Sequence, residues 1–516
     1  MAVAEAVGDS AAGRSWGVVL LALIVGAFMA LLDSSIVNVA IPTMERAFGV
    51  SITQVEWVVT IYLLALGVVV PASGWLGDRL GFKRLYLLSL LVFTIGSGLC
   101  ALSWSLPVLI AARVLQALGG GMIMPTTMAM VYRIIPRQHL GVATGFFGTA
   151  ILLAPAVGPT LGGYLVEYVN WRWIFTVNLP VGVLGMMLAA SVLPEFAVTD
   201  PGPFDLWGFV ASAVALFALL LALSQGQAWG WQSPLINGLW YVSGVAFLAF
   251  LWIELTVSRP LLDLGVFRYG SFTASMFYVV GLNIALFAGA FFIPIFLQMV
   301  RGMGALQTGL ILMPGALASG VMMPVAGKLY DRVGPLPPVL AGTVVLVWGN
   351  ALMRHLGLTT GSETIVAWMV VRGLGMGLAM MPATTAGMSA IPQHLVGRAS
   401  AVNNIIMRVA GSFGIAVLTV LLNRGIATQT AAIAIGLRPQ TPAGAALHQL
   451  MAGAGPAAAA MLGRLGGMVG AVAFTRSVDN LFVLLSLIAA ASLPPALLLR
   501  KVHQDGAAAA HTPVGE

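Results

Sequence analysis

The chain has 516 residues, of which 59% are hydrophobic and only 8% are charged, and its formal net charge is +7 at pH 7. A soluble globular protein carries about 25% charged residues, so this composition excludes a cytosolic enzyme and a disordered scaffold and predicts an integral membrane protein. The basic residues are scattered rather than clustered, which argues against nucleic acid as a partner. The single cysteine, Cys100, excludes an internal disulfide and a cysteine-based metal cluster, and we expect neither a metal nor a cofactor.

Fourteen apolar runs are long enough to cross a bilayer as helices, since a hydrocarbon core needs about 20 apolar residues in helical form. They predict an all-α integral membrane fold with fourteen transmembrane helices. In chain order they cover residues 16–40, 54–75, 84–104, 106–133, 138–168, 172–193, 205–224, 236–257, 270–300, 305–330, 335–354, 363–390, 395–424 and 476–500.

The charges between the runs predict the orientation of the chain. An even number of spans puts both termini on one side, and with that side cytoplasmic the inner segments hold thirteen Lys and Arg residues against four in the short outer loops. We therefore expect cytoplasmic tails at 1–15 and 501–516. The long segment 424–475 is rich in Ala and Gly, and we expect it to form a loosely structured outer loop or a surface helix.

The chain contains an internal repeat. Segment 71–81 recurs as 324–334, with Pro, Gly, Leu, Asp, Arg and Gly matched at an offset of 253 residues, and Arg113 is echoed by Arg372. Both copies lie on the predicted cytoplasmic side, so the halves run parallel about an axis along the membrane normal, with a substrate site between them near the midplane. The repeat predicts a six-helix bundle, two extra spans with their loops and a second six-helix bundle, at 16–193, 194–269 and 270–500.

Asp33 lies well inside the first span, with no basic residue near it in sequence. A carboxylate at the bilayer centre costs a few kcal/mol on insertion scales, which makes Asp33 a candidate for binding and releasing a proton. Arg113 cannot lose its charge, so it must face the bundle interior, with Asp33 as its leading partner. Protonation of Asp33 would then free Arg113 and bias one conformation. The alternative is a static pair with a structural role alone.

Glu56, Arg372 and Arg408 are further charged residues of the spans. Glu56, at the outer edge of the second helix, is a candidate for a second proton or a cationic substrate, and equally for an interfacial residue beside Trp57 in the aromatic belt. Arg372 and Arg408 are intramembrane, and we expect structural roles for both.

The repeated loop is too short and too polar to hold a substrate. Gly74 and Gly81 permit a tight turn and close helix approach, and Asp78 can latch to basic groups or to a helix N-terminus on the facing bundle. In the second copy Pro335 replaces the basic end of the first, so we expect a weaker latch there. A purely topological role of the positive charge is the alternative. The gating candidates are Gly74, Asp78, Arg79, Gly81, Arg84, Asp331 and Arg332.

Ala154, Gly158 and Gly162 recur every four residues along the fifth span and line one helical face. Small residues at this spacing let helix backbones pack closely, and Pro159 bends the helix. Generic helix packing would use the same residues.

Polar and aromatic side chains within the spans are candidates for the lining of a substrate cavity. At helical spacing such residues more often pack inside a bundle or face lipid. The candidates are Asn38, Tyr62, Gln116, Asn178, Asn283, Phe292, Gln298 and Asn403.

Four motifs occur in order along the chain: 32–42 with Asp33; Gly74, Asp78, Arg79, Gly81 and Arg84; Arg113, Gln116 and Gly119; and Gly158, Pro159, Gly162 and Gly163. With them, residues 16–500 resemble the major facilitator superfamily and, within it, the fourteen-helix drug/proton antiporters of the EmrB/QacA type. The resemblance implies two bundles related by a pseudo-two-fold axis plus two extra helices. It also implies proton coupling at Asp33 and a seal against proton leak at the fourth motif.

We therefore predict a transporter, not an enzyme, in a bacterial cytoplasmic membrane. It would export lipophilic compounds, neutral or singly cationic, in exchange for protons, by alternating access. No ATP-binding Walker motif is present. The alternative is a proton-coupled exporter of one endogenous metabolite, lipid, siderophore or antibiotic. We expect a monomer in the lipid bilayer, with a periplasmic adaptor as a further partner to test. A membrane-embedded enzyme, a receptor and a channel are disfavoured.

Overall fold

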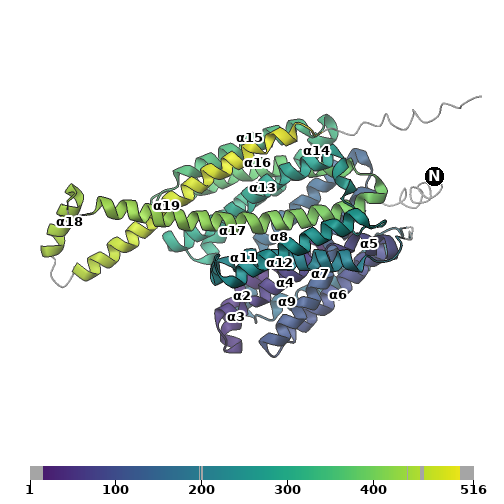
Figure 1. The fold of residues 1–516 in the computed structure, drawn as a ribbon, viewed down its shortest axis with the longest axis horizontal. Helices are drawn as coiled ribbons and strands as arrows, with labels where there is room; N and C mark the ends of the chain where they lie inside the picture. Colours follow the sequence, from purple (N-terminus) through teal and green to yellow (C-terminus); the bar gives the residue numbers. More distant parts are fainter. Residues whose placement is uncertain (1–15, 197, 199–200, 439, 454–457, 500–516) are drawn as a thin grey trace, which may run out of the picture.

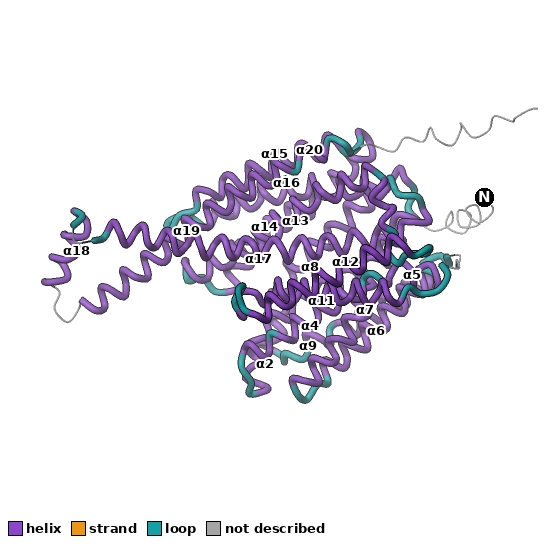
Figure 2. The backbone as a smooth tube through the Cα atoms, in the orientation of Figure 1, coloured by secondary structure: helices purple, strands orange, loops and turns teal. Residues whose placement is uncertain are grey.

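The computed structural model describes residues 16–196, 198, 201–438, 440–453 and 458–499, and these ranges form helices and loops without a strand (Figures 1 and 2). Within them, fourteen helices are long and apolar enough to cross a membrane. The predicted all-α membrane fold with fourteen spans is confirmed. The two predicted tails, 1–15 and 501–516, lie outside the described residues.

The first half of the chain folds as a bundle around two clusters of buried apolar side chains. Its helices are α2 (Trp16–Phe48), α3 (Ile52–Val55), α4 (Trp57–Val69), α5 (Ala72–Leu80), α6 (Phe82–Ala101), α7 (Leu106–Ile134), η1 (Arg137–His139), α8 (Leu140–Tyr168), α9 (Trp173–Thr176) and α10 (Asn178–Val192).

The second half packs around two further apolar clusters. Its helices are α13 (Gly270–Ile295), η3 (Phe296–Val300), α14 (Ala305–Val333), α15 (Leu336–Leu352), η4 (Met353–His355), α16 (Ser362–Ser389), η5 (Gln393–Leu395), α17 (Val396–Gly436), α18 (Pro442–Gly453), α19 (Ala458–Ala491) and α20 (Leu493–Ala496).

Two extra spans, α11 (Leu206–Trp229) and α12 (Pro234–Thr256), separate the halves in sequence, and η2 (Leu264–Arg268) follows them. Helix α11 contacts both α4 of the first half and α17 of the second. Leu220 and Leu221 of α11 pack in a small cluster with Leu64 of α4 and Val409 of α17. The first extra span thus bridges the two halves along one side.

The span predicted at 54–75 is divided into α3, α4 and α5. Pro71 lacks a backbone N–H, and α5 begins immediately after it as a separate short helix. Gly81 ends α5 with φ +84°, a conformation that side chains disfavour, and this turn starts α6 at once. The break places Asp78 on a short helix of its own at one end of the bundle. We call this end, which α5 shares with the end of α14, the motif end.

Of the two alternatives expected for 424–475, a loosely structured outer loop or a surface helix, the described residues favour helix. Helix α17 continues through Gly436 and α19 begins at Ala458, with α18 between them. In Figure 1 the three helices project from the end of the molecule opposite to α5. Ala-rich sequence has high helix propensity. Helices α17 and α19 therefore continue beyond the apolar runs from which the spans were predicted.

The small residues of the fifth span pack against the helix that carries Asp33. A side chain on Gly162 would place its Cβ 3.0 Å from the carbonyl oxygen of Ile36 in α2, and one on Gly158 would lie 3.2 Å from the Ile36 nitrogen. Ser35 donates a hydrogen bond to the carbonyl oxygen of Pro155 at 3.0 Å. By contrast, a Cβ added to Gly163, the next residue of the motif, would have no atom within 4 Å. The α2–α8 contact thus fixes the helix backbone just beyond Asp33.

This contact predicts different outcomes for two neighbouring glycines. Gly162→Val forces α8 away from the Ile36 backbone and should cost about 2 kcal/mol of folding stability, as overpacking does in other cores. Gly163→Val is the matched control, because the space beside it is open. Thermal unfolding of the purified variants measures both. Equal loss of stability in the two variants would contradict the packing described.

Candidate functional site

A fully buried ion pair lies inside the first half. Arg113 Nη1 of α7 is 2.6 Å from Asp33 Oδ2 of α2, and both side chains are 0% exposed. Removing either partner of a buried pair leaves an uncompensated charge and costs about 3–5 kcal/mol. The predicted partnership of Asp33 and Arg113 is present in the structure.

Polar side chains from three helices complete the surroundings of Asp33. Its Oδ1 accepts hydrogen bonds from Gln116 Nε2 of α7 at 2.9 Å and from Asn178 Nδ2 of α10 at 2.8 Å. Asn178 Nδ2 also donates to Ser97 Oγ of α6 at 3.0 Å. Helices α2, α7 and α10 therefore meet at one carboxylate, and Asn178 links it to α6 through Ser97.

The guanidinium of Arg113 is held on several sides as well. It donates from Nη1 to Gln116 Oε1 at 2.7 Å and from Nε to the carbonyl oxygen of Val58 at 3.2 Å. Its Cζ lies 3.8 Å from the centroid of the Tyr62 ring, a cation–π contact. Its Nη2 and the Tyr62 hydroxyl have no hydrogen-bond partner among the described residues.

The second half repeats the arginine without the acid. Arg372 of α16 donates to Asn350 Oδ1 at 3.1 Å and to the carbonyl oxygen of Ala285 at 2.6 Å. These acceptors are neutral, so no protonation step changes this arrangement. The two copies of the repeat differ in chemistry at their centres.

Glu56 is exposed and is not part of this buried network. It lies at the junction of α3 and α4 and caps α3 through its backbone N–H. The structure does not bring it to Asp33.

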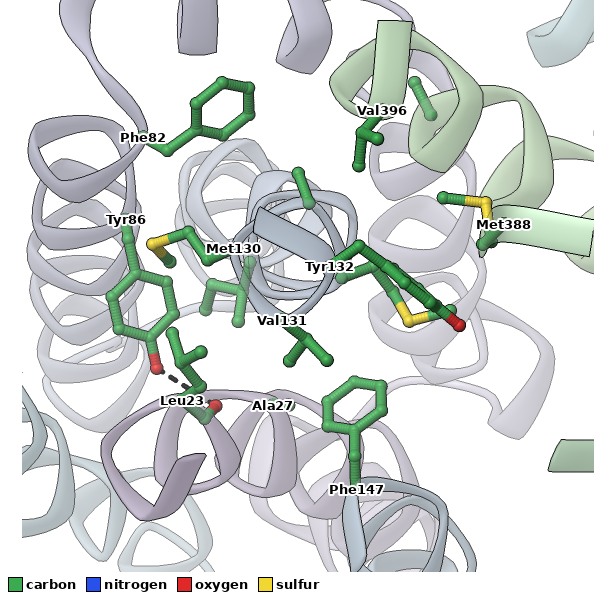
Figure 3. Close-up of a cluster of buried hydrophobic side chains, with 14 of the residues drawn as sticks. Leu23, Ala27, Phe82, Tyr86, Met130, Val131, Tyr132, Phe147, Met388 and Val396 are labelled. Atoms are coloured by element: carbon green, nitrogen blue, oxygen red, sulfur yellow. Dashed lines mark hydrogen bonds between the residues drawn. The ribbon is translucent and has the colours of Figure 1, made fainter. Parts of the chain in front are cut away.

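The two halves close against each other at the motif end through apolar side chains. Figure 3 shows this inner seal, in which Phe82, Tyr132 and Phe147 of the first half share a cluster with Met388 and Val396 of the second. Figure 1 shows the helices of the two halves converging toward α5 and spreading at the opposite end.

Hydrogen bonds between the halves reinforce the seal. Asp331 at the end of α14 accepts from the backbone N–H groups of Gly141 at 2.8 Å and Val142 at 3.0 Å, at the start of α8. Thr144 and Thr385 share a hydrogen bond of 2.8 Å between their hydroxyls. A carboxylate on the first N–H groups of a helix is favoured by both hydrogen bonding and the helix dipole.

The first copy of the loop makes a different set of contacts. Asp78 Oδ1 lies 3.6 Å from Arg133 Nη2 of the same half, and burial raises the pKa of this carboxyl while Arg133 and Arg398 oppose the rise. Gly74 packs against Arg398: a Cβ added to Gly74 would lie 3.3 Å from the Arg398 backbone nitrogen. The helix-capping latch that we expected of the repeat is therefore made by Asp331, and the expected weakness of the second copy is not visible in its contacts.

The segments that flank the extra helices lie over the same end. Glu195 is 3.4 Å from Lys83 and 4.0 Å from Arg84. Farther on, Asp263 is 3.4 Å from Arg398 of α17. The linkers before and after α11 and α12 thus contact the start of α6 in the first half and the start of α17 in the second. Arg79 and Arg332 are exposed at this end.

The structure redistributes the predicted cavity residues. Gln116, Asn178 and Tyr62 belong to the buried network rather than to an exposed lining. Phe292 is part of the apolar core of the second half. The remaining four divide into two buried residues, Asn283 and Asn403, and two exposed ones, Asn38 and Gln298.

Sequence analysis missed several residues of the site. Ser97 carried no signal beyond its polarity inside a span. Gly141 and Gly145 let α8 approach α14 at the backbone of Gly327 and Met323. They are four residues apart, as the small residues at 154, 158 and 162 are, but they form a separate pair out of register with that series. That spacing could have revealed them.

Comparisons with known proteins agree with this architecture. Residues 23–415 match the family model of the Major Facilitator Superfamily. The chain is 34% identical over 418 residues to the multidrug resistance protein B homolog of Mycobacterium tuberculosis, covering 79% of this chain and 76% of that one. It is 33% identical over 414 residues to the tetracenomycin C resistance and export protein of Streptomyces glaucescens, covering 80% and 76%.

A solved structure shows the same fold. The human organic anion transporter MFSD10 superposes with a TM-score of 0.59 at 13% identity, over 94% of this chain and all of the other. This likeness concerns the fold alone. With the family match over most of its length, the chain is a transporter rather than an enzyme and belongs to the major facilitator superfamily.

Proposed function

We propose that the chain is a proton-coupled antiporter that exports lipophilic small molecules by alternating access. The names of its relatives support efflux as the direction of transport. The observation that carries proton coupling is the ion pair of Asp33 and Arg113, buried completely and tied to four helices. Of the groups in that network, only the carboxylate can readily gain a proton, because a guanidinium stays charged.

The proposed coupling works through the loss of charge on Asp33. A proton on Asp33 removes the anion that holds Arg113, so the guanidinium must find other acceptors and the helices around it shift. Proton entry along a membrane potential supplies about 2.3 kcal/mol per charge per 100 mV. This is comparable to the change needed to tip a two-state equilibrium, since about 1.4 kcal/mol changes a ratio tenfold.

The proposed gate is the motif end, closed in this conformation by the inner seal and by Asp331. We place that end at the cytoplasm, with both tails inside, as the distribution of Lys and Arg indicates. Opening it breaks the contacts between α8 and α14 while the opposite end closes. The proposed unit is a monomer in a bacterial cytoplasmic membrane; an adaptor would meet it at the projecting α17–α19 hairpin.

A second candidate is export of one endogenous compound. A relative named for tetracenomycin C resistance and export favours it, because that name specifies a single antibiotic. Transport of a panel of unrelated dyes separates the two candidates: several substrates support multidrug efflux, and silence across the panel supports a dedicated exporter.

The first prediction concerns the coupling carboxylate. Asp33→Asn keeps the shape of the side chain and can still accept from Gln116, but it cannot cycle a proton. We expect substrate-induced proton movement in proteoliposomes to be lost. Glu56→Gln is the control, since Glu56 is exposed and apart from the network, and it should retain proton movement. Proton movement that survives Asp33→Asn would place the coupling site elsewhere.

The second prediction concerns the latch. Asp331→Asn removes the charge that caps α8 and should cost the closed state about 1.5 kcal/mol, or roughly tenfold in the open population. A cysteine at Thr385, in a Cys100→Ser background, reports opening because Thr385 is buried in the closed gate. We expect faster labelling by N-ethylmaleimide.

Glu363→Gln provides the matched control for this experiment, because it removes an exposed negative charge from the same half. Its labelling rate should equal that of the parent. An unchanged rate in Asp331→Asn would show that the latch does not hold the gate.

A further inference from the structure

Arg113, Arg372 and Arg408 lie inside spanning helices of the two bundles, and the first two have acceptors. Arg113 binds Asp33, and Arg372 binds the side chain of Asn350 and a backbone carbonyl of α13. A guanidinium inside a membrane protein keeps its charge and needs such acceptors. The third, Arg408, is the exception.

Arg408 lies four turns into α17, half-buried at the junction of the halves. Its Cδ would be 3.6 Å from a Cβ on Gly67, so the side chain reaches across to α4 of the first half. Its neighbour Val409 packs against the cluster that α11 forms with α4. The guanidinium therefore belongs to the interface that alternating access must remodel.

No hydrogen bond or ion pair reaches Arg408 from the part of the chain that the structure describes. Asp33 is already committed to Arg113, Gln116 and Asn178.

A guanidinium keeps its charge in every environment of a protein. Arg408 is half-buried where the halves meet, and it has no acceptor in the part of the chain that the structure describes. Its N–H donors match the oxygen atoms of an anion.

We propose that Arg408 binds an anionic group of the exported molecule. The substrate class is then lipophilic compounds that carry a carboxylate, sulfonate or phenolate, in place of the cations expected from the sequence. The inference rests on the proposed function, because the exported molecule must enter between the halves to meet Arg408.

Two probes with the same aromatic rings test the charge preference. 8-Anilinonaphthalene-1-sulfonate carries a sulfonate, and N-phenyl-1-naphthylamine lacks it. Binding of each to the full chain is measured by titration calorimetry in nanodiscs of zwitterionic lipid, with empty discs subtracted. We expect the sulfonate to bind about tenfold more tightly than the neutral probe, as one charge-assisted contact provides.

Variants assign the preference to Arg408. Arg408→Gln should make the two probes bind equally while binding of the neutral probe stays unchanged, which also shows that the variant is folded. Arg408→Lys should keep part of the preference. Arg424→Gln is the matched control, because Arg424 is exposed on the same helix. Equal binding of both probes by the parent protein, or a preference that survives Arg408→Gln, would overturn the proposal.

An anion at Arg408 can come from the exported molecule or from a lipid headgroup, and anionic lipid in the discs distinguishes the two. If discs that contain phosphatidylglycerol abolish sulfonate binding in the parent protein, the site holds a lipid headgroup and the assignment to substrate is overturned. Unchanged sulfonate binding in these discs supports the assignment to substrate. These titrations use no proton gradient. Failure of proton coupling with the sulfonate preference intact would reject the antiport mechanism and leave the anion site standing.

Discussion

A carboxylate and a guanidinium without access to water have to satisfy each other, and the first half of this transporter is arranged around that requirement. Asp33 and Arg113 are 2.6 Å apart, and Gln116, Asn178 and Ser97 extend the network to α6 and α10. The glycines of α8 hold the backbone of α2 in place one turn beyond the acid. Because loss of one charge leaves the other buried and uncompensated, a single proton has a large effect on the helices that share the pair.

Gene duplication gave the two halves one scaffold and different chemistry. Arg372 repeats Arg113, but among the described residues its hydrogen-bond acceptors are neutral, so it is not held by a carboxylate as Arg113 is. At the motif end the difference is reversed: Asp331 caps a helix of the opposite half, whereas Asp78 pairs with Arg133 of its own half. The extra helices add contacts to this end through Glu195 and Asp263 and join α4 to α17 through α11. The proposed proton site and the closing contact thus depend on different copies of the repeat.

Composition and hydropathy were sufficient to predict fourteen spans, because the thickness of the hydrocarbon core sets the length of each apolar helix. An apolar run of that length is visible in the sequence itself. The pairing of Asp33 with Arg113 was also predictable, since neither charge has another way to be satisfied. The identity of Gln116 and Asn178 as partners of Asp33 was not, because polarity inside a span says nothing about the direction in which a side chain points. The ends of α17 and α19 were missed for a related reason: helix continuation past the membrane leaves no mark in a hydropathy window.

The central claim is that Asp33 changes its protonation state during transport. Infrared difference spectroscopy measures this directly, through the carbonyl stretch of a protonated carboxyl group, as the purified protein is titrated and loaded with a transported compound. The account predicts a carboxyl band that appears or disappears with substrate in the parent protein and is missing in Asp33→Asn. A protein that transports in exchange for protons while the Asp33 carboxylate stays ionised throughout would contradict it.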